Sequence, residues 1–132
     1  MNRTKAREQA FLMLFQYKFR PDETATILED FFADNKAGAQ TGYIENVVLG
    51  AVEKIDEIDE ILSGYTKDWQ VDRISSVSLA LLRLAVYEMK YMDDIPPAVS
   101  VNEAVALAKE YEGEEAAPFV NGILGKIKNE IG

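Results

Sequence analysis

The chain has 132 residues, a length that suits one domain with a substantial core, and it contains neither cysteine nor histidine. Disulfides, thiolate nucleophiles, Cys/His zinc sites and histidine-based catalysis are therefore excluded. No spacing picks out a pair of carboxylates for acid–base work, so we expect no enzyme activity, no cofactor and no metal. The lack of cysteine fits a cytoplasmic protein, and no apolar run reaches the ~18 residues that span a bilayer.

The net charge of −9 is distributed unevenly along the chain. Residues 1–20 carry five basic side chains against Glu8 alone, a net charge of +4. The remaining 112 residues carry 9 basic and 22 acidic side chains, a net charge of −13. Such a molecule can attract phosphate at one pole while its body repels it.

Apolar spacing is helical almost everywhere, which predicts an all-α fold of six to seven helices within one domain, residues 1–132. The first helix is predicted over about 4–19, ended by Pro21, with an apolar stripe of Phe11, Leu14, Phe15 and Phe19. A second helix follows Asp22. Residues 35–42, NKAGAQTG, are predicted to form a loop, and residues 43–62 one long helix or two consecutive ones.

The next break, SGYTKDW, is predicted to begin around Gly64. Residues 74–92, ISSVSLALLRLAVYEMKYM, are apolar around nearly the whole circumference, as in a central helix wrapped by others. Arg83 lies within this segment, and a structural ion pair with a carboxylate from another element is favoured over a ligand contact. After DDIPP, the sequence SVNE matches a capping box, so a helix is predicted from about Val101 to Gly113. The last helix is predicted from about Pro118 to Ile131.

The basic cluster at the N-terminus admits two interpretations. At about 100° per residue, Arg3 and Arg7 fall close together, in line with Phe11 and Leu14, whereas Lys5 points to the far side. The cluster is either a frayed, solvated terminus or a phosphate-contacting arm whose binding weakens with salt.

Phe119 is predicted to lie off the core face of the last helix, beside Gly122 and Lys126. An aromatic ring next to a small residue and a cation suits stacking of an unpaired base with a phosphate nearby. The alternative is ordinary packing against another helix. A single RNA site would require Phe119 to lie beside Arg3 and Arg7.

Four stretches resemble the NusB family of bacterial transcription antitermination factors: RTKAREQAFLMLFQY, LLRLAVYEM, IPPAVSVNEAVALAKEY and FVNGILGKI. The resemblance implies two packed helical subdomains and a non-enzymatic role. NusB proteins bind single-stranded boxA RNA with NusE, a small-subunit ribosomal protein. With other Nus factors they help RNA polymerase to read through terminators, chiefly on ribosomal RNA operons.

The resemblance also implies roles for individual residues. RNA contacts are expected at Arg3, Lys5 and Arg7 and at the motif aromatic Phe119. Glu115 is expected to influence complex assembly, and Ser78 to lie on the NusE-facing side. Two departures from the family, Thr4 and Pro118, are expected to weaken RNA binding by the isolated chain and to increase its dependence on the partner. A homodimer that buries the RNA surface and a purely protein-binding helical adaptor stay open as alternatives.

Overall fold

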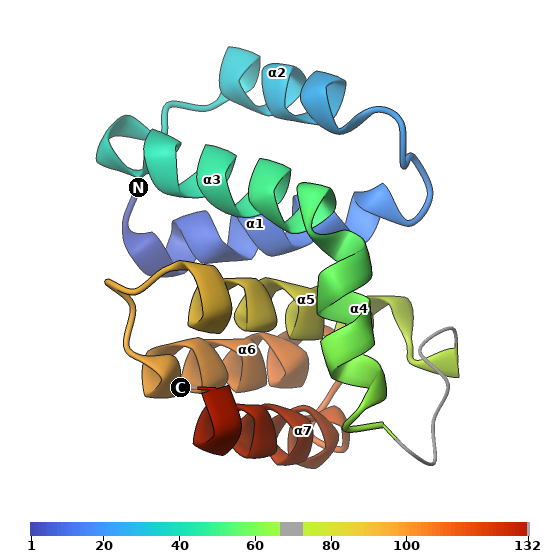
Figure 1. Cartoon of the computed structure of the whole chain (residues 1–132). Helices are drawn as coiled ribbons and strands as arrows, with labels where there is room; N and C mark the ends of the chain where they lie inside the picture. The colour runs from blue at the N-terminus through green and yellow to red at the C-terminus, as the bar shows by residue number, and fades with distance from the viewer. Residues whose placement is uncertain (67–72, 132) are drawn as a thin grey trace.

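The computed structural model describes residues 1–66 and 73–131, and these residues form seven α-helices, one short 3₁₀ helix and no strand (Figure 1). The all-α prediction is therefore confirmed. The helices are α1 (Arg3–Tyr17), α2 (Thr24–Asp34), α3 (Thr41–Glu53), α4 (Ile55–Ser63), α5 (Ser76–Tyr91), α6 (Pro97–Tyr111) and α7 (Ala116–Ile131), with η1 (Gly38–Gln40) ahead of α3.

The helices form two packed groups, as the family resemblance implies. Figure 1 shows α1, α2 and α3 in the upper part of the view and α5, α6 and α7 in the lower part, with α4 crossing at the side. The groups meet where α1 and α3 pack against α5. One cluster of buried side chains continues through all seven of these helices, so the two groups share a core.

Helix α1 begins and ends for reasons that are visible in the sequence. The Asn2 side chain caps its start by accepting a hydrogen bond from the backbone N–H of Lys5 at 2.8 Å. The helix ends at Tyr17 rather than Phe19, and Phe19 is 62% exposed instead of continuing the apolar stripe. Proline disfavours helical backbone at the residue before it, so Pro21 ends the regular helix a few residues earlier than the apolar spacing indicates.

The segment predicted as one long helix or two is two helices, α3 and α4, which meet at Lys54. The predicted loop before them is partly helical, because η1 occupies its middle and α3 already includes Gly42. Helix α4 ends at Ser63, in agreement with the break predicted at Gly64. The remainder of that break, from residue 67 on, lies outside the described residues.

Helix α5 is the central helix that its composition predicts. It packs against α1, α3, α4, α6 and α7, and its buried side chains cover all sides of the helix from Leu79 to Met89. The Ser75 side chain caps it by accepting from the backbone N–H of Ser78. Because its neighbours surround it, any polar group on α5 must find a partner inside the core.

The capping box predicted at Ser100 is wrong. Helix α6 begins at Pro97, one turn earlier, with Pro97 in the first turn where its missing N–H costs nothing. Ser100 is therefore inside the helix and buried, and its hydroxyl donates to Glu88 of α5 at 2.7 Å. After α6, Gly113 takes a φ of +112°, and α7 begins at Ala116 with Pro118 in its first turn.

Gly50 lies where α3 packs closely against α5. A Cβ atom at Gly50 would lie 2.0 Å from the Tyr87 hydroxyl oxygen, and that hydroxyl donates to Asn46 Oδ1 at 2.5 Å. We expect Gly50→Ala to lower the free energy of unfolding by about 1–3 kcal/mol, because the tyrosine ring must move and its hydrogen bond is lost. Denaturant unfolding followed by circular dichroism measures this change.

Gly125, in the middle of α7, is the matched control, since a Cβ atom there would meet nothing within 4 Å. Gly125→Ala should raise the free energy of unfolding by up to about 1 kcal/mol through helix propensity. Equal stability of the two variants would show that the contact between Gly50 and Tyr87 does not restrict this position.

Candidate functional site

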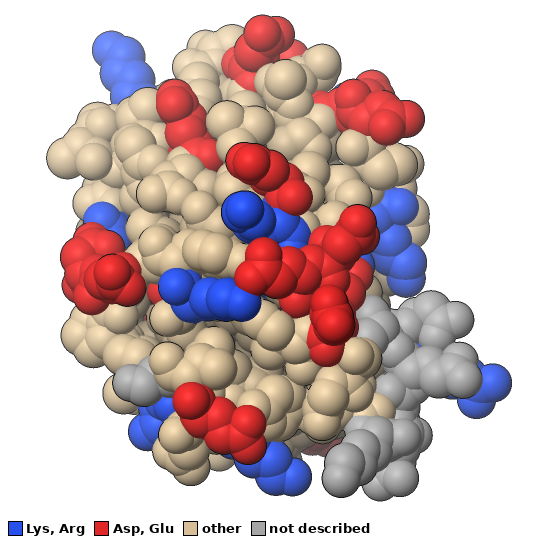
Figure 2. Space-filling view, viewed as in Figure 1, with Lys and Arg blue, Asp and Glu red and all other residues tan. Residues whose placement is uncertain are grey.

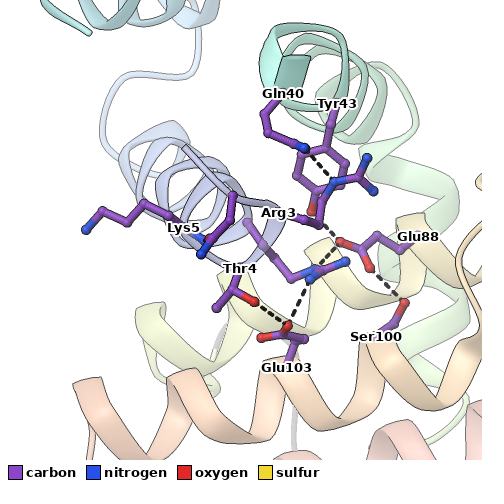
Figure 3. A network of polar contacts seen from close by, with 10 residues as sticks. Arg3, Thr4, Lys5, Gln40, Tyr43, Glu88, Ser100 and Glu103 are labelled. Atoms are coloured by element: carbon purple, nitrogen blue, oxygen red, sulfur yellow. Dashed lines mark hydrogen bonds and ion pairs between the residues drawn. The ribbon is translucent and has the colours of Figure 1, made fainter. Parts of the chain in front are cut away.

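Arg3 is held against the start of α3. Its Nε donates to Gln40 Oε1 at 2.6 Å, and its guanidinium lies 4.3 Å from the centre of the Tyr43 ring (Figure 3). A cation at this distance from an aromatic face is attracted to the ring. Arg3 is only half-exposed and is ordered by two contacts, so the N-terminus is not a frayed tail.

Arg7 is a core residue, with 2% of its surface exposed. Its Nε donates to Glu88 Oε2 at 2.7 Å, and its Nη1 lies 3.3 Å from Glu103 Oε1. The prediction that Arg7 contacts RNA does not agree with this burial. The helical wheel placed Arg7 correctly in line with Phe11 and Leu14, but a cation on the apolar stripe faces the core, where carboxylates from α5 and α6 meet it.

The carboxylate of Glu88 is the centre of a buried polar network (Figure 3). Glu88 is 0% exposed and accepts hydrogen bonds from Arg7, from the Tyr43 hydroxyl and from the Ser100 hydroxyl. Burial alone would lower the pKa of Arg7, but the hydrogen bond and charge of Glu88 outweigh it and the pKa is raised. Burial, followed by the charge of Glu88, raises the pKa of Tyr43. Tyr43 therefore stays a neutral donor at neutral pH.

Lys5 lies on a different side of α1 from Arg3. Its side chain is exposed and pairs with Glu8 at 3.0 Å. Glu8 also accepts a hydrogen bond from the Tyr111 hydroxyl at 2.5 Å, at the end of α6. That hydrogen bond raises the pKa of Tyr111 to about 12. Lys5 thus shares a surface with an exposed aromatic residue that sequence analysis did not single out, because Tyr111 ends a helix without any motif.

Phe119 is half-buried near the start of α7, at the edge of a surface pocket of about 270 Å³. The pocket is lined by Arg73, Ile74, Ser75, Ser78, Glu112, Glu115, Ala116 and Phe119. The structure therefore brings together Phe119 with both residues predicted to bind the partner, Ser78 and Glu115. Ser78 itself is buried, and its hydroxyl donates to Glu112 Oε2 at 3.1 Å, so it shapes the pocket rather than projecting from it.

Phe119 and Arg3 lie at opposite ends of the molecule. Helix α1 runs antiparallel to α5, because Arg7 near its start contacts Glu88 whereas Lys18 just after its end donates to Ser76 Oγ at 2.8 Å. Phe119 lies at the end marked by the contact of Lys18 with Ser76, since the pocket of Phe119 includes Ser78. Ten residues of α5 separate Ser78 from Glu88, about 15 Å of helix. In Figure 1, α1 starts near the N label, while α7 starts at the far side and runs back to the C label.

The single site that would place Phe119 beside Arg3 and Arg7 is therefore not observed. Among the residues that the structure describes, the cations at the Phe119 end include Arg73 in the pocket and Lys18 beside the start of α5. Lys126 is exposed on α7, two helical turns beyond Phe119. Arg73 carried no sequence signal, because it precedes α5 without any motif and only the packing of α7 brings it to the aromatic ring.

Arg83 forms the structural ion pair that its position predicts. Its Nε and Nη2 donate to the two carboxylate oxygens of Asp59 in α4, at 2.9 and 2.8 Å. Two parallel hydrogen bonds of this kind fix both side chains. Within residues 1–66 and 73–131, no group of acidic side chains is arranged to hold a metal ion. No helix in those residues is long and apolar enough to cross a bilayer.

The NusB family model matches residues 4–129 of the chain. The chain belongs to the NusB family. It is 44% identical to the transcription antitermination protein NusB of Bacillus velezensis, with 99% of this chain and 98% of that protein covered. The NusB of Thermoanaerobacter sp. strain X514 is 42% identical, with 100% of this chain and 94% of that protein covered.

Solved NusB structures have the same fold. A structure of NusB from T. maritima gives a TM-score of 0.91 at 36% identity, covering 98% of this chain and 92% of that one. A crystal structure of antitermination factors NusB and NusE in complex with dsRNA gives a TM-score of 0.85 at 30% identity, covering 98% and 99%. These matches agree with the family that the four sequence stretches indicate.

Proposed function

We propose that this chain is a non-catalytic antitermination factor that binds boxA-type single-stranded RNA together with NusE. In this role it promotes read-through by RNA polymerase with other Nus factors, chiefly on ribosomal RNA operons. The observation that carries the proposal is the pocket that groups Phe119, Arg73, Ser78 and Glu115 in a member of this family. The solved complex of a similar NusB with NusE and dsRNA supports NusE and RNA as partners in this proposal.

The proposed RNA surface runs from Lys5 to Phe119. Lys5 is linked through Glu8 to Tyr111, and the next residue, Glu112, lines the pocket of Phe119. The surface thus offers two aromatic rings for base stacking, with Lys5 at one end and Arg73 and Lys18 at the other. Lys126 extends it along α7. Arg3 would contribute from the edge near α3, while Arg7 would act only by fixing α1.

The few cations on this surface imply shared binding. If three or four cationic side chains contact phosphates of a single RNA strand, the logarithm of the affinity falls with the logarithm of the salt concentration with a slope of roughly −2 to −3. The acidic body opposes further contacts, so a partner must supply the rest of the affinity. This is consistent with a heterodimer in which NusE binds beside the pocket, near the exposed Glu115.

Binding of fluorescent boxA-type RNA, with and without NusE, across a salt series tests the proposal. We expect weak binding by the chain alone and a large gain with NusE, with the shallow negative slope above. The absence of salt-dependent RNA binding in every mixture, including those with NusE, would instead favour the helical adaptor that binds only protein. A scrambled RNA of the same composition is the control for sequence preference.

A further inference from the structure

An open apolar groove lies between α2 and α3, outside the surface described above. Its volume is about 510 Å³, and it is lined by Ala25, Leu28, Glu29, Phe32, Ala33, Glu45 and Leu49. Leu49 is a large aliphatic side chain that is nevertheless 47% exposed, on the outer face of α3. Exposed apolar surface bordered by charged side chains is typical of an interaction site.

A second hollow adjoins the first along the same face of α3. It has a volume of about 400 Å³ and shares Leu49 and Glu45 with the groove. Gly42 lies in this hollow, and a Cβ atom there would meet nothing within 4 Å, so the absence of a side chain lets another backbone approach α3 closely. Leu49 is therefore a ridge with a depression on each side, a shape that matches the side-chain rows of a packed helix.

The charge around this face is strongly negative. Residues 21–60 contain 11 acidic and 2 basic side chains, a net charge of −9. Glu29, Glu45 and Glu53 line the two hollows, and none of them forms an ion pair with a lysine or arginine that the structure describes. In Figure 2, acidic side chains outnumber basic ones on the visible surface over α2 and α3.

This charge decides what can bind. Nucleic acid is repelled by the acidic rim, and a second copy of the chain would place its own glutamates against these. We propose that the groove between α2 and α3 binds a basic amphipathic helix of a partner protein. Its apolar side chains would enter the hollows beside Leu49, and its lysines or arginines would pair with Glu29, Glu45 and Glu53.

The site goes beyond the proposed RNA and NusE surface. Helix α2 packs only on α1 and α3 among the principal helix contacts, and it lies at the opposite side of Figure 1 from α7. A partner bound there leaves the pocket of Phe119 open. The chain could then join an RNA complex and a further protein at the same time.

A labelled model peptide provides the test. The probe is a helix of about 18 residues with leucines at i, i+3, i+4 and i+7 spacing and lysines elsewhere; a second peptide carries glutamate in place of lysine. Fluorescence anisotropy with the full-length chain should detect binding of the lysine peptide only. Amide shifts in NMR spectra should map it to α2 and α3.

Two variants define the site. Leu49→Ser removes the apolar ridge, and Glu29→Lys with Glu45→Lys reverses the rim; each should weaken peptide binding at least about tenfold. Asp93→Lys with Asp94→Lys makes the same charge change at exposed positions between α5 and α6 and should leave binding unchanged. RNA binding with NusE should persist in all variants.

Four results would overturn the proposal. The first is no binding of the lysine peptide. The second is equal weakening by both pairs of charge reversals, which would reveal only general attraction to an acidic protein. The third is full affinity in Leu49→Ser. The fourth is a concentration-dependent dimer in sedimentation that Leu49→Ser abolishes, which would assign the groove to a second copy.

Discussion

Glu88→Ala is expected to lower the free energy of unfolding by about 3–5 kcal/mol, the largest effect of any single substitution considered for this chain. Glu88 accepts from Arg7, Tyr43 and Ser100 inside the core, and alanine would leave all three donors without their acceptor. The buried guanidinium of Arg7 would keep only Glu103 as a charge partner. Urea unfolding followed by circular dichroism measures the loss.

Glu57→Ala is the matched control, because Glu57 also pairs with a cation, Lys90, but at the surface. An exposed pair contributes about 0–1 kcal/mol, so the control should unfold almost like the parent chain. Replacing both Arg7 and Glu88 by apolar residues, as Arg7→Met with Glu88→Leu, should recover only part of the loss, since Tyr43 and Ser100 stay unsatisfied. A Glu88 variant as stable as the Glu57 variant would contradict the network's structural role.

The central helix and the element order follow from local sequence, whereas the partners of polar residues do not. All-round apolar composition identifies α5 because a helix surrounded by others has no polar face. Glu88, however, lies 81 residues from Arg7 in the chain, and no local pattern links them. The capping-box pattern at Ser100 misleads for the same reason: its hydroxyl is used in a tertiary contact with Glu88, which a sequence window does not contain.

The candidate site was only partly predictable. Phe119, Ser78 and Glu115 came from the last helix's wheel and the family resemblance, and packing of α7 on α5 brings them into one pocket. The wheel of the first helix separated Lys5 from Arg3, but it could not indicate which side faces α6. Tyr111 donates to Glu8, which pairs with Lys5, so the side of α1 that carries Lys5 faces the end of α6. The proposed RNA surface therefore extends from that side of α1 to Phe119.

Phe119→Ala is expected to reduce the affinity of the chain–NusE complex for boxA-type RNA by roughly 5- to 150-fold, the equivalent of about 1–3 kcal/mol for one stacked base. The half-buried ring lines the same pocket as Arg73, and the proposed function has the ring stack on a base while Arg73 contacts a phosphate. The salt slope should stay unchanged, since the substitution removes no charge. Fluorescence anisotropy with labelled RNA across a salt series measures both quantities.

Phe119→Leu separates stacking from packing, because leucine keeps the apolar contacts of a half-buried side chain but offers no aromatic face. RNA affinity should fall nearly as far as in Phe119→Ala, while unfolding and NusE binding stay close to those of the parent chain. Phe31→Leu in α2 changes an aromatic residue of the other subdomain and should leave RNA affinity intact. If Phe119→Leu binds RNA normally, and Phe119→Ala loses RNA affinity only because the chain is less stable, then Phe119 is a packing residue. The RNA would in that case be read by Tyr111 and the cations beside it, and Tyr111→Leu would be the variant that loses affinity.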